Sequence, residues 1–112
     1  MTMTMTDVQK AAVALIDARR AHSTAEDAAC NPEGLCAQGC EPCARAAEEG
    51  RRRPWGCVRS RAMGRAWNAY EDACGEFCQA VRRVHGTAEQ FPFVGNAARF
   101  ARERGEILPQ DF

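Results

Sequence analysis

A heptad pattern of apolar residues constrains the fold of this chain more than any other feature of its sequence. Seven apolar or small side chains recur at alternating spacings of four and three residues: Met63, Trp67, Tyr70, Cys74, Phe77, Val81 and Val84. An unbroken repeat over three heptads places one apolar stripe along a helix. The pattern therefore predicts a long helix over residues 57–85, with Gly86 as its stop.

A second long helix is predicted over residues 7–29. Its apolar and small side chains fall three and four residues apart and therefore share one face: Val8, Ala11, Leu15, Ala18, His22, Ala25 and Ala29. Asp7 can cap its start. The helix should end before Pro32, because proline disfavours the helical conformation of the preceding Asn31.

Two shorter helices complete the predicted set. Pro42 suits the first turn of one that ends at Gly50, and Asn96 is expected to cap another over residues 97–104. No strand pattern is present. The sequence thus predicts an all-α fold, a small antiparallel helical bundle of two long and two short helices. Residues 30–57 would form a Cys-rich hairpin and basic connector between the long helices.

The chain is poor in large apolar residues. Its 112 residues fit a single domain over 1–112, with a disordered start at 1–6 and an irregular tail at 106–112. Leu, Ile, Val and Phe together number 16, against 21 alanines. Because a core built mainly from alanine is thin, a metal, disulfides or a partner is expected to add stability.

The beginning of the sequence, MTMTMT, has neither the basic start nor the apolar stretch of a secretory signal. The longest apolar run, residues 11–16, is too short to span a bilayer. We therefore expect a cytoplasmic protein without a membrane partner, in which thiols stay reduced. The seven cysteines are an odd number, which also disfavours a complete disulfide framework.

Five of the cysteines should meet at one end of the antiparallel long helices: Cys30, Cys36, Cys40, Cys43 and Cys57. A short Cys-x-x-Cys turn with two further thiolates is typical of structural zinc. The predicted ligands are Cys36, Cys40, Cys43 and Cys57, with Cys30 in reserve. Cys74 and Cys78 are expected to be core residues, because Cys74 lies roughly 26 Å along the helix from Cys57.

Other uses of these thiols stay open. An iron–sulfur cluster needs the same ligands, and passive reduced thiols would bind no cofactor. The segment CEPC, residues 40–43, resembles the C-x-P-C of thioredoxin-like oxidoreductases, in which a helix N-terminus lowers a thiol pKa. That resemblance implies a thiol redox sensor.

Two further segments are candidate contact surfaces. The basic stretch 51–65 holds six arginines and no acidic residue, and could bind DNA or an acidic partner through Arg51, Arg52, Arg53, Arg59 and Arg61. The zero net charge of the chain argues against an extensive nucleic-acid footprint. Three aromatic residues near the end of the chain could cover the bundle, or contact a partner or a second copy of the chain: Phe91, Phe93 and Phe100.

No nucleophile–base pair and no Gly-rich phosphate loop is recognisable, so we expect no enzyme. The sequence favours a zinc-stabilised protein-interaction module, and its small size suits a phage or mobile-element accessory protein that binds a host factor. A DNA-binding transcriptional regulator and a thiol or iron–sulfur sensor are the alternatives.

Overall fold

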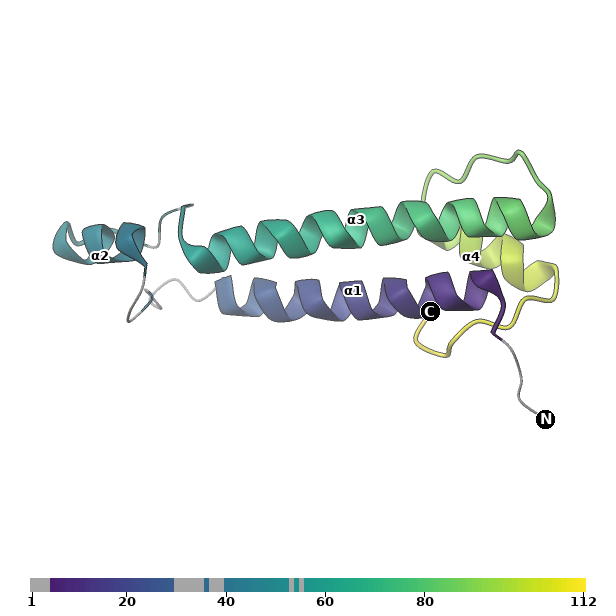
Figure 1. The fold of residues 1–112 in the computed structure, drawn as a ribbon, viewed down its shortest axis with the longest axis horizontal. Coiled ribbons are helices and arrows are strands. Elements are labelled where there is room, and N and C mark those ends of the chain that lie inside the picture. The colour runs from purple at the N-terminus through teal and green to yellow at the C-terminus, as the bar shows by residue number, and fades with distance from the viewer. Residues whose placement is uncertain (1–4, 30–35, 37–39, 53, 55) are drawn as a thin grey trace. The chain divides into compact units, whose positions relative to one another are not determined.

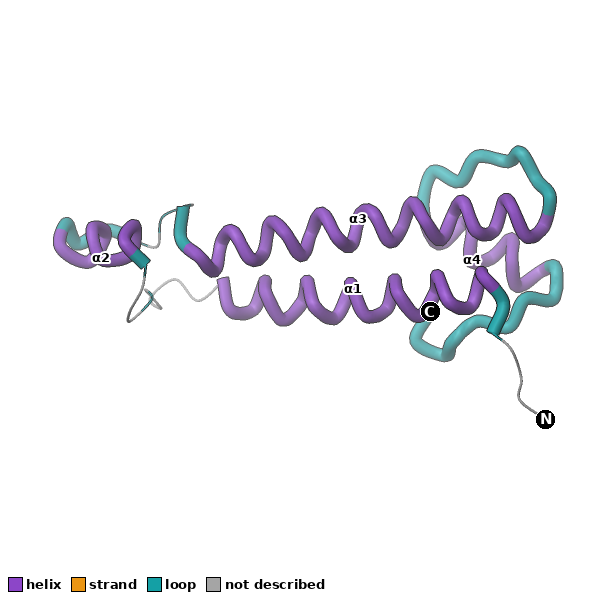
Figure 2. The backbone as a smooth tube through the Cα atoms, in the orientation of Figure 1, coloured by secondary structure: helices purple, strands orange, loops and turns teal. Residues whose placement is uncertain are grey.

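The described residues form four helices and no strand. A computed structural model describes residues 5–29, 36, 40–52, 54 and 56–112. The helices are α1 (Asp7–Ala29), α2 (Glu41–Glu48), α3 (Val58–His85) and α4 (Val94–Glu103) (Figure 1). Loops make up the rest of the described chain (Figure 2). The all-α prediction is confirmed, whereas the disorder predicted for the start falls mostly on residues 1–4, outside the described residues.

The beginning of α4 differs from the prediction. The helix starts at Val94 rather than after Asn96, and Phe93 is its N-cap residue. The Asn96 side chain still serves the helix start, because its Oδ1 accepts a hydrogen bond from the Phe93 N–H at 3.2 Å. Asn96 therefore acts from inside the first turn, as the third residue of a capping box does.

The chain divides into two compact units. The first consists of residues 1–19 and 69–112, and the second of residues 20–68. Each long helix contributes residues to both units. That the whole chain behaves as one domain stays a prediction.

The core of the first unit is built from α1, α3 and α4. Phe77 is its largest fully buried side chain. The remaining buried members are mostly small: Val8, Ala12, Leu15, Ala73, Ala80, Val81, Ala97, Ala98, Phe100 and Ala101. Because alanine side chains are short, the helices can pack closely around the Phe77 ring.

Within the first unit, residues early in α1 lie near residues late in α3, and residues later in α1 lie near residues earlier in α3. Asp7, at the start of α1, pairs with Arg83 near the end of α3 at 3.8 Å. Later in α1, Leu15 and Arg19 line a cavity together with Tyr70. Helices that run in opposite directions give this order of contacts. That all four helices form one antiparallel bundle stays a prediction.

The heptad seam is only partly buried. Trp67 and Val84 are 45% and 43% exposed, whereas Ala73 and Ala80 are buried beside Phe77. A two-helix seam buries one narrow stripe, but the third helix of this core covers a wider face. The buried face of α3 therefore includes small residues outside the heptad positions.

The segment after α4 forms no helix and returns to α1 and the core. The Thr6 hydroxyl donates a hydrogen bond to Glu106 at 2.5 Å, and the Gln9 side-chain amide donates to the Ile107 carbonyl at 2.9 Å. The Phe112 ring lies 4.5 Å from the Phe77 ring, centroid to centroid. These contacts hold residues 106–112 against the first unit.

Because Phe77 is the largest fully buried side chain of the first unit, its removal tests this account of the core. We expect Phe77→Ala to lower the free energy of unfolding by about 3–5 kcal/mol, because it leaves a cavity among side chains too small to fill it. Urea denaturation followed by circular dichroism measures the change. Phe93→Ala is the matched control, since Phe93 is 75% exposed and should change stability by less than about 0.5 kcal/mol. Equal losses in the two variants would contradict this account of the core.

Candidate metal centre

Two helix starts in the second unit carry cysteines of the candidate site. Cys40 is the N-cap residue of α2, with an extended backbone (φ −127°), and its carbonyl accepts from the Ala44 N–H at 3.0 Å. Cys57 directly precedes α3, and its carbonyl accepts from the Arg61 N–H at 2.9 Å. Both cysteines thus lie where a helix presents unpaired N–H groups and positive potential.

The sulfur atoms of four cysteines converge. The ligand atoms of Cys36, Cys40, Cys43 and Cys57 all lie within 4.8 Å of one another. The Cys57 sulfur is 3.4 Å from that of Cys36 and 3.3 Å from that of Cys43. Cys40, Cys43 and Cys57 are buried, and Cys36 is half-buried. The four residues form one compact cluster, closed on most sides by protein.

These spacings suit a metal ion better than a disulfide. Four thiolates around zinc at about 2.3 Å would stand about 3.8 Å apart in a tetrahedron. A disulfide would bring two of them to about 2.05 Å. The separations of 3.3 and 3.4 Å between Cys57 and its two neighbours lie close to the tetrahedral value. The cluster can therefore hold a metal ion after small outward shifts of the sulfurs.

Backbone N–H groups favour the charged form of two of the thiols. Burial raises the pKa of Cys57, but the N–H groups of Arg59 and Ser60, with the neighbouring thiols, lower it to about 6. The N–H groups of Val58 and Cys43 lower the pKa of Cys40 below its usual value. Both effects come from helix starts.

The other two thiols hold their protons more firmly. The hydrogen bond to Cys57 is the largest cause that raises the pKa of Cys36. For Cys43, the Cys36 backbone lowers the pKa, but burial and the neighbouring thiols outweigh it and raise the value to about 12. Four thiolates cannot share so small a space without a cation, which would supply the missing positive charge.

The structure brings together the four cysteines named from the sequence as first-choice ligands. Cys30, the reserve, lies outside the described residues. Cys74 and Cys78 lie in the first unit, where burial raises the pKa of each. The backbone donors at the start of α3 were not anticipated, although the position of Cys57 at the start of the predicted helix was the available signal.

Two arginines of the basic stretch 51–65 have interaction partners nearby in the sequence. Arg51 pairs with Glu49 at 2.5 Å, and Arg61 donates to the Gly56 carbonyl at 3.0 Å. Arg52 is exposed and Arg59 half-buried, whereas Arg53 lies outside the described residues. Contact of these arginines with DNA or an acidic partner stays a prediction.

The three phenylalanines predicted as partner contacts have different surroundings. Phe93 is 75% exposed, whereas Phe100 is only 8% exposed and belongs to the core of the first unit. Phe91 is half-buried against that core. Phe100 therefore corresponds to the covering role considered for these residues, and Phe93 alone offers a largely free ring.

Comparison with known proteins finds no matching family model, no matching curated protein and no matching solved structure. Among the described residues, none of the helices has the length and apolarity that crossing a membrane demands.

The cluster can be tested with Co²⁺, whose thiolate complexes absorb in the visible range. We expect Co²⁺ to bind the reduced protein at one site, and Cys43→Ser to abolish or strongly weaken binding because it removes one of four ligands. Cys74→Ser is the matched control, since Cys74 is outside the cluster, and should bind Co²⁺ like the unsubstituted protein. Similar titrations for both variants would show that the cluster is not the metal site.

Proposed function

We propose that this chain is a zinc-stabilised, non-enzymatic helical module that binds another protein. The observation that carries the metal assignment is the convergence of four cysteine sulfurs within 4.8 Å. An all-thiolate set of four ligands leaves no open coordination position. Such closed sites are structural rather than catalytic.

The composition of the second unit explains why a metal would be needed there. Among its described residues, the buried apolar side chains belong to Cys40, Cys43, Ala46 and Cys57. Three of these four are proposed ligands. A unit with so little other buried apolar surface gains most of its stability from the metal, as small metal-bound domains do.

The proposed site also agrees with the electrostatics of the helices. Four thiolates and one Zn²⁺ carry a net charge of about −2, which the starts of α2 and α3 would stabilise through their N–H groups. The site requires reduced thiols, so the proposal includes a reducing compartment such as the cytoplasm.

The interaction role is supported by exposed apolar side chains in the first unit. Phe93 and Ile107 are 75% and 72% exposed. Large apolar groups that lie free on a small helical protein are available to contact a partner. Its small size would suit a phage or mobile-element accessory protein. The partner would then be a protein of the host cell.

Elemental analysis and chelation test the metal assignment. We expect the purified protein to contain one zinc per chain and to be colourless. Removing zinc should lower helicity and the free energy of unfolding, by about 2.7 kcal/mol where free zinc is a hundredfold above its dissociation constant. Thermal denaturation with and without chelator measures the change.

Two other results would contradict this function. Iron and sulfide with visible colour would identify a redox cluster in place of structural zinc. A metal-free protein whose melting temperature is the same with and without chelator would show that the thiols do not stabilise the fold by holding a metal. Cys74→Ser/Cys78→Ser controls for nonspecific effects of thiol loss, and should retain zinc.

A further inference from the structure

The four cysteines of the metal centre differ in their exposure to solvent. Cys40, Cys43 and Cys57 are 6%, 1% and 0% exposed. Cys36, by contrast, is half-buried. A small reagent in solution therefore reaches the Cys36 side chain before the other three.

Cys57 is held in place beside Cys36 by its backbone. The Cys57 N–H donates to the Pro54 carbonyl at 3.0 Å, and the Cys57 carbonyl accepts from the Arg61 N–H at 2.9 Å. The Cys57 sulfur lies 3.4 Å from the Cys36 sulfur. Because the S–S bond of a disulfide is about 2.05 Å long, these two sulfurs need to approach by only about 1.4 Å to be joined.

Cys43 lies equally near Cys57, at 3.3 Å between sulfurs, but is less suited to the same link. It belongs to α2 (Glu41–Glu48), so the helix holds its backbone, and it is almost completely buried. Cys36 lies outside the four helices. A shift of Cys36 toward Cys57 therefore breaks no helical hydrogen bond. Exposure and backbone position thus select the same pair of cysteines.

We propose that Cys36 and Cys57 form a disulfide when a peroxide oxidises the zinc-loaded protein, and that this modification releases the ion. The inference rests on the metal assignment made above and adds the regulation of that site. It names both the residues that are modified and the class of reagent that modifies them.

The reaction takes two steps and consumes one peroxide molecule. A sulfur bound to zinc is already a thiolate and is therefore nucleophilic. The Cys36 thiolate attacks one peroxide oxygen, the O–O bond breaks, and hydroxide leaves, which produces a sulfenic acid at Cys36. The Cys57 thiolate then attacks that sulfur, the S–O bond breaks, and a second hydroxide leaves as the disulfide forms. Two electrons pass from the two sulfurs to the peroxide, and two protons from solvent convert the hydroxides to water.

The disulfide removes two of the four proposed ligands. A structural zinc site needs four ligands, and a sulfur within a disulfide no longer carries the negative charge that binds the ion. Cys40 and Cys43 alone cannot complete the coordination. The disulfide then replaces the ion as the link between residues 36 and 57. In a reducing compartment such a disulfide is transient, so reduction lets the ion return.

The linkage is mapped in the unsubstituted, zinc-loaded chain after treatment with hydrogen peroxide. Free thiols are blocked with iodoacetamide, the disulfide is reduced, and the released thiols are labelled with N-ethylmaleimide before mass spectrometry. We expect this label at Cys36 and Cys57, a loss of two free thiols per chain, and release of the zinc to a metallochromic indicator. Dithiothreitol with added zinc should reverse all three changes.

A substitution tests the role of the exposed sulfur. Histidine can bind zinc but cannot form a disulfide, so Cys36→His should lose zinc release over the time in which the unsubstituted chain is emptied by peroxide. Its zinc content is measured before peroxide is added, and the mapped linkage decides alone where this variant does not load. The matched control is Cys74→Ser/Cys78→Ser, which removes two thiols outside the cluster and should release zinc as the unsubstituted chain does.

Three results would overturn the proposal. They are label at another pair of cysteines, such as Cys40 and Cys43, oxidation of Cys36 without a disulfide, and zinc that stays bound after peroxide treatment. The zinc content before oxidation separates these results from failure of the proposed function. A chain purified without zinc contradicts the metal assignment itself, whereas a zinc-loaded chain that gives any of the three results contradicts this inference alone.

Discussion

The potential at two helix starts is the constraint on which the second unit depends. Cys40 and Cys57 cap α2 and α3, so both present sulfur to backbone N–H groups that have no partner within their own helix. This arrangement favours negative charge on the sulfurs before any metal arrives. It also creates a conflict, because Cys36 and Cys43 add further thiols to the same small volume. The metal ion proposed for this site would neutralise charge that the helix starts balance only in part.

The buried residues of the two units differ in kind. In the first, the Phe77 ring is enclosed by mostly small side chains from three helices, and the tail returns to place Phe112 against it. In the second, the described buried surface consists largely of cysteine. An alanine-rich chain can form long helices but supplies little apolar volume for a second core. Metal coordination can provide stability there with few residues.

The sequence predicted the helices well because their signals are local. Spacing of three and four residues located α1 and α3, and proline and glycine marked the ends of α2. It was wrong about the start of α4, where Asn96 acts from within the first turn instead of before it. It was incomplete about burial on α3, because the seam could not show that α4 would cover a wider face. The cysteine cluster was predictable only through the further assumption that the long helices are antiparallel.

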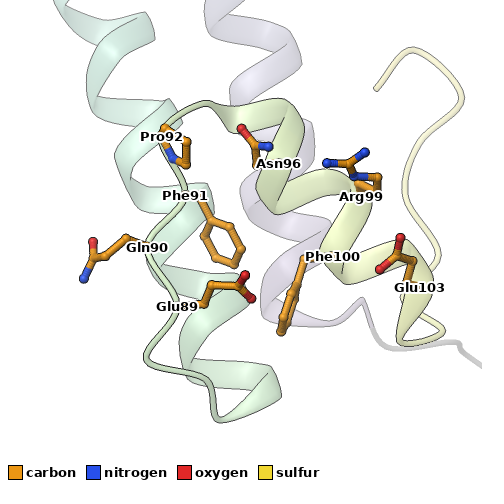
Figure 3. Close-up of a pocket in the computed structure, with 8 residues that line it drawn as sticks. All are labelled: Glu89, Gln90, Phe91, Pro92, Asn96, Arg99, Phe100 and Glu103. Atoms are coloured by element: carbon orange, nitrogen blue, oxygen red, sulfur yellow. The ribbon is translucent and has the colours of Figure 1, made fainter.

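The surroundings of Phe100 show what the sequence alone leaves undetermined. Phe91 and Phe100 are close in the sequence, yet nothing in their spacing places their rings edge to face (Figure 3). By itself, the sequence determined the helical class, the ends of most helices and the set of four cysteines, since each follows from spacing and backbone preference. Only the tertiary structure decided which aromatic rings are buried and that the four sulfurs lie within 4.8 Å of one another. Those features depend on contacts between different segments of the chain. The number of residues between two segments does not determine their distance in space.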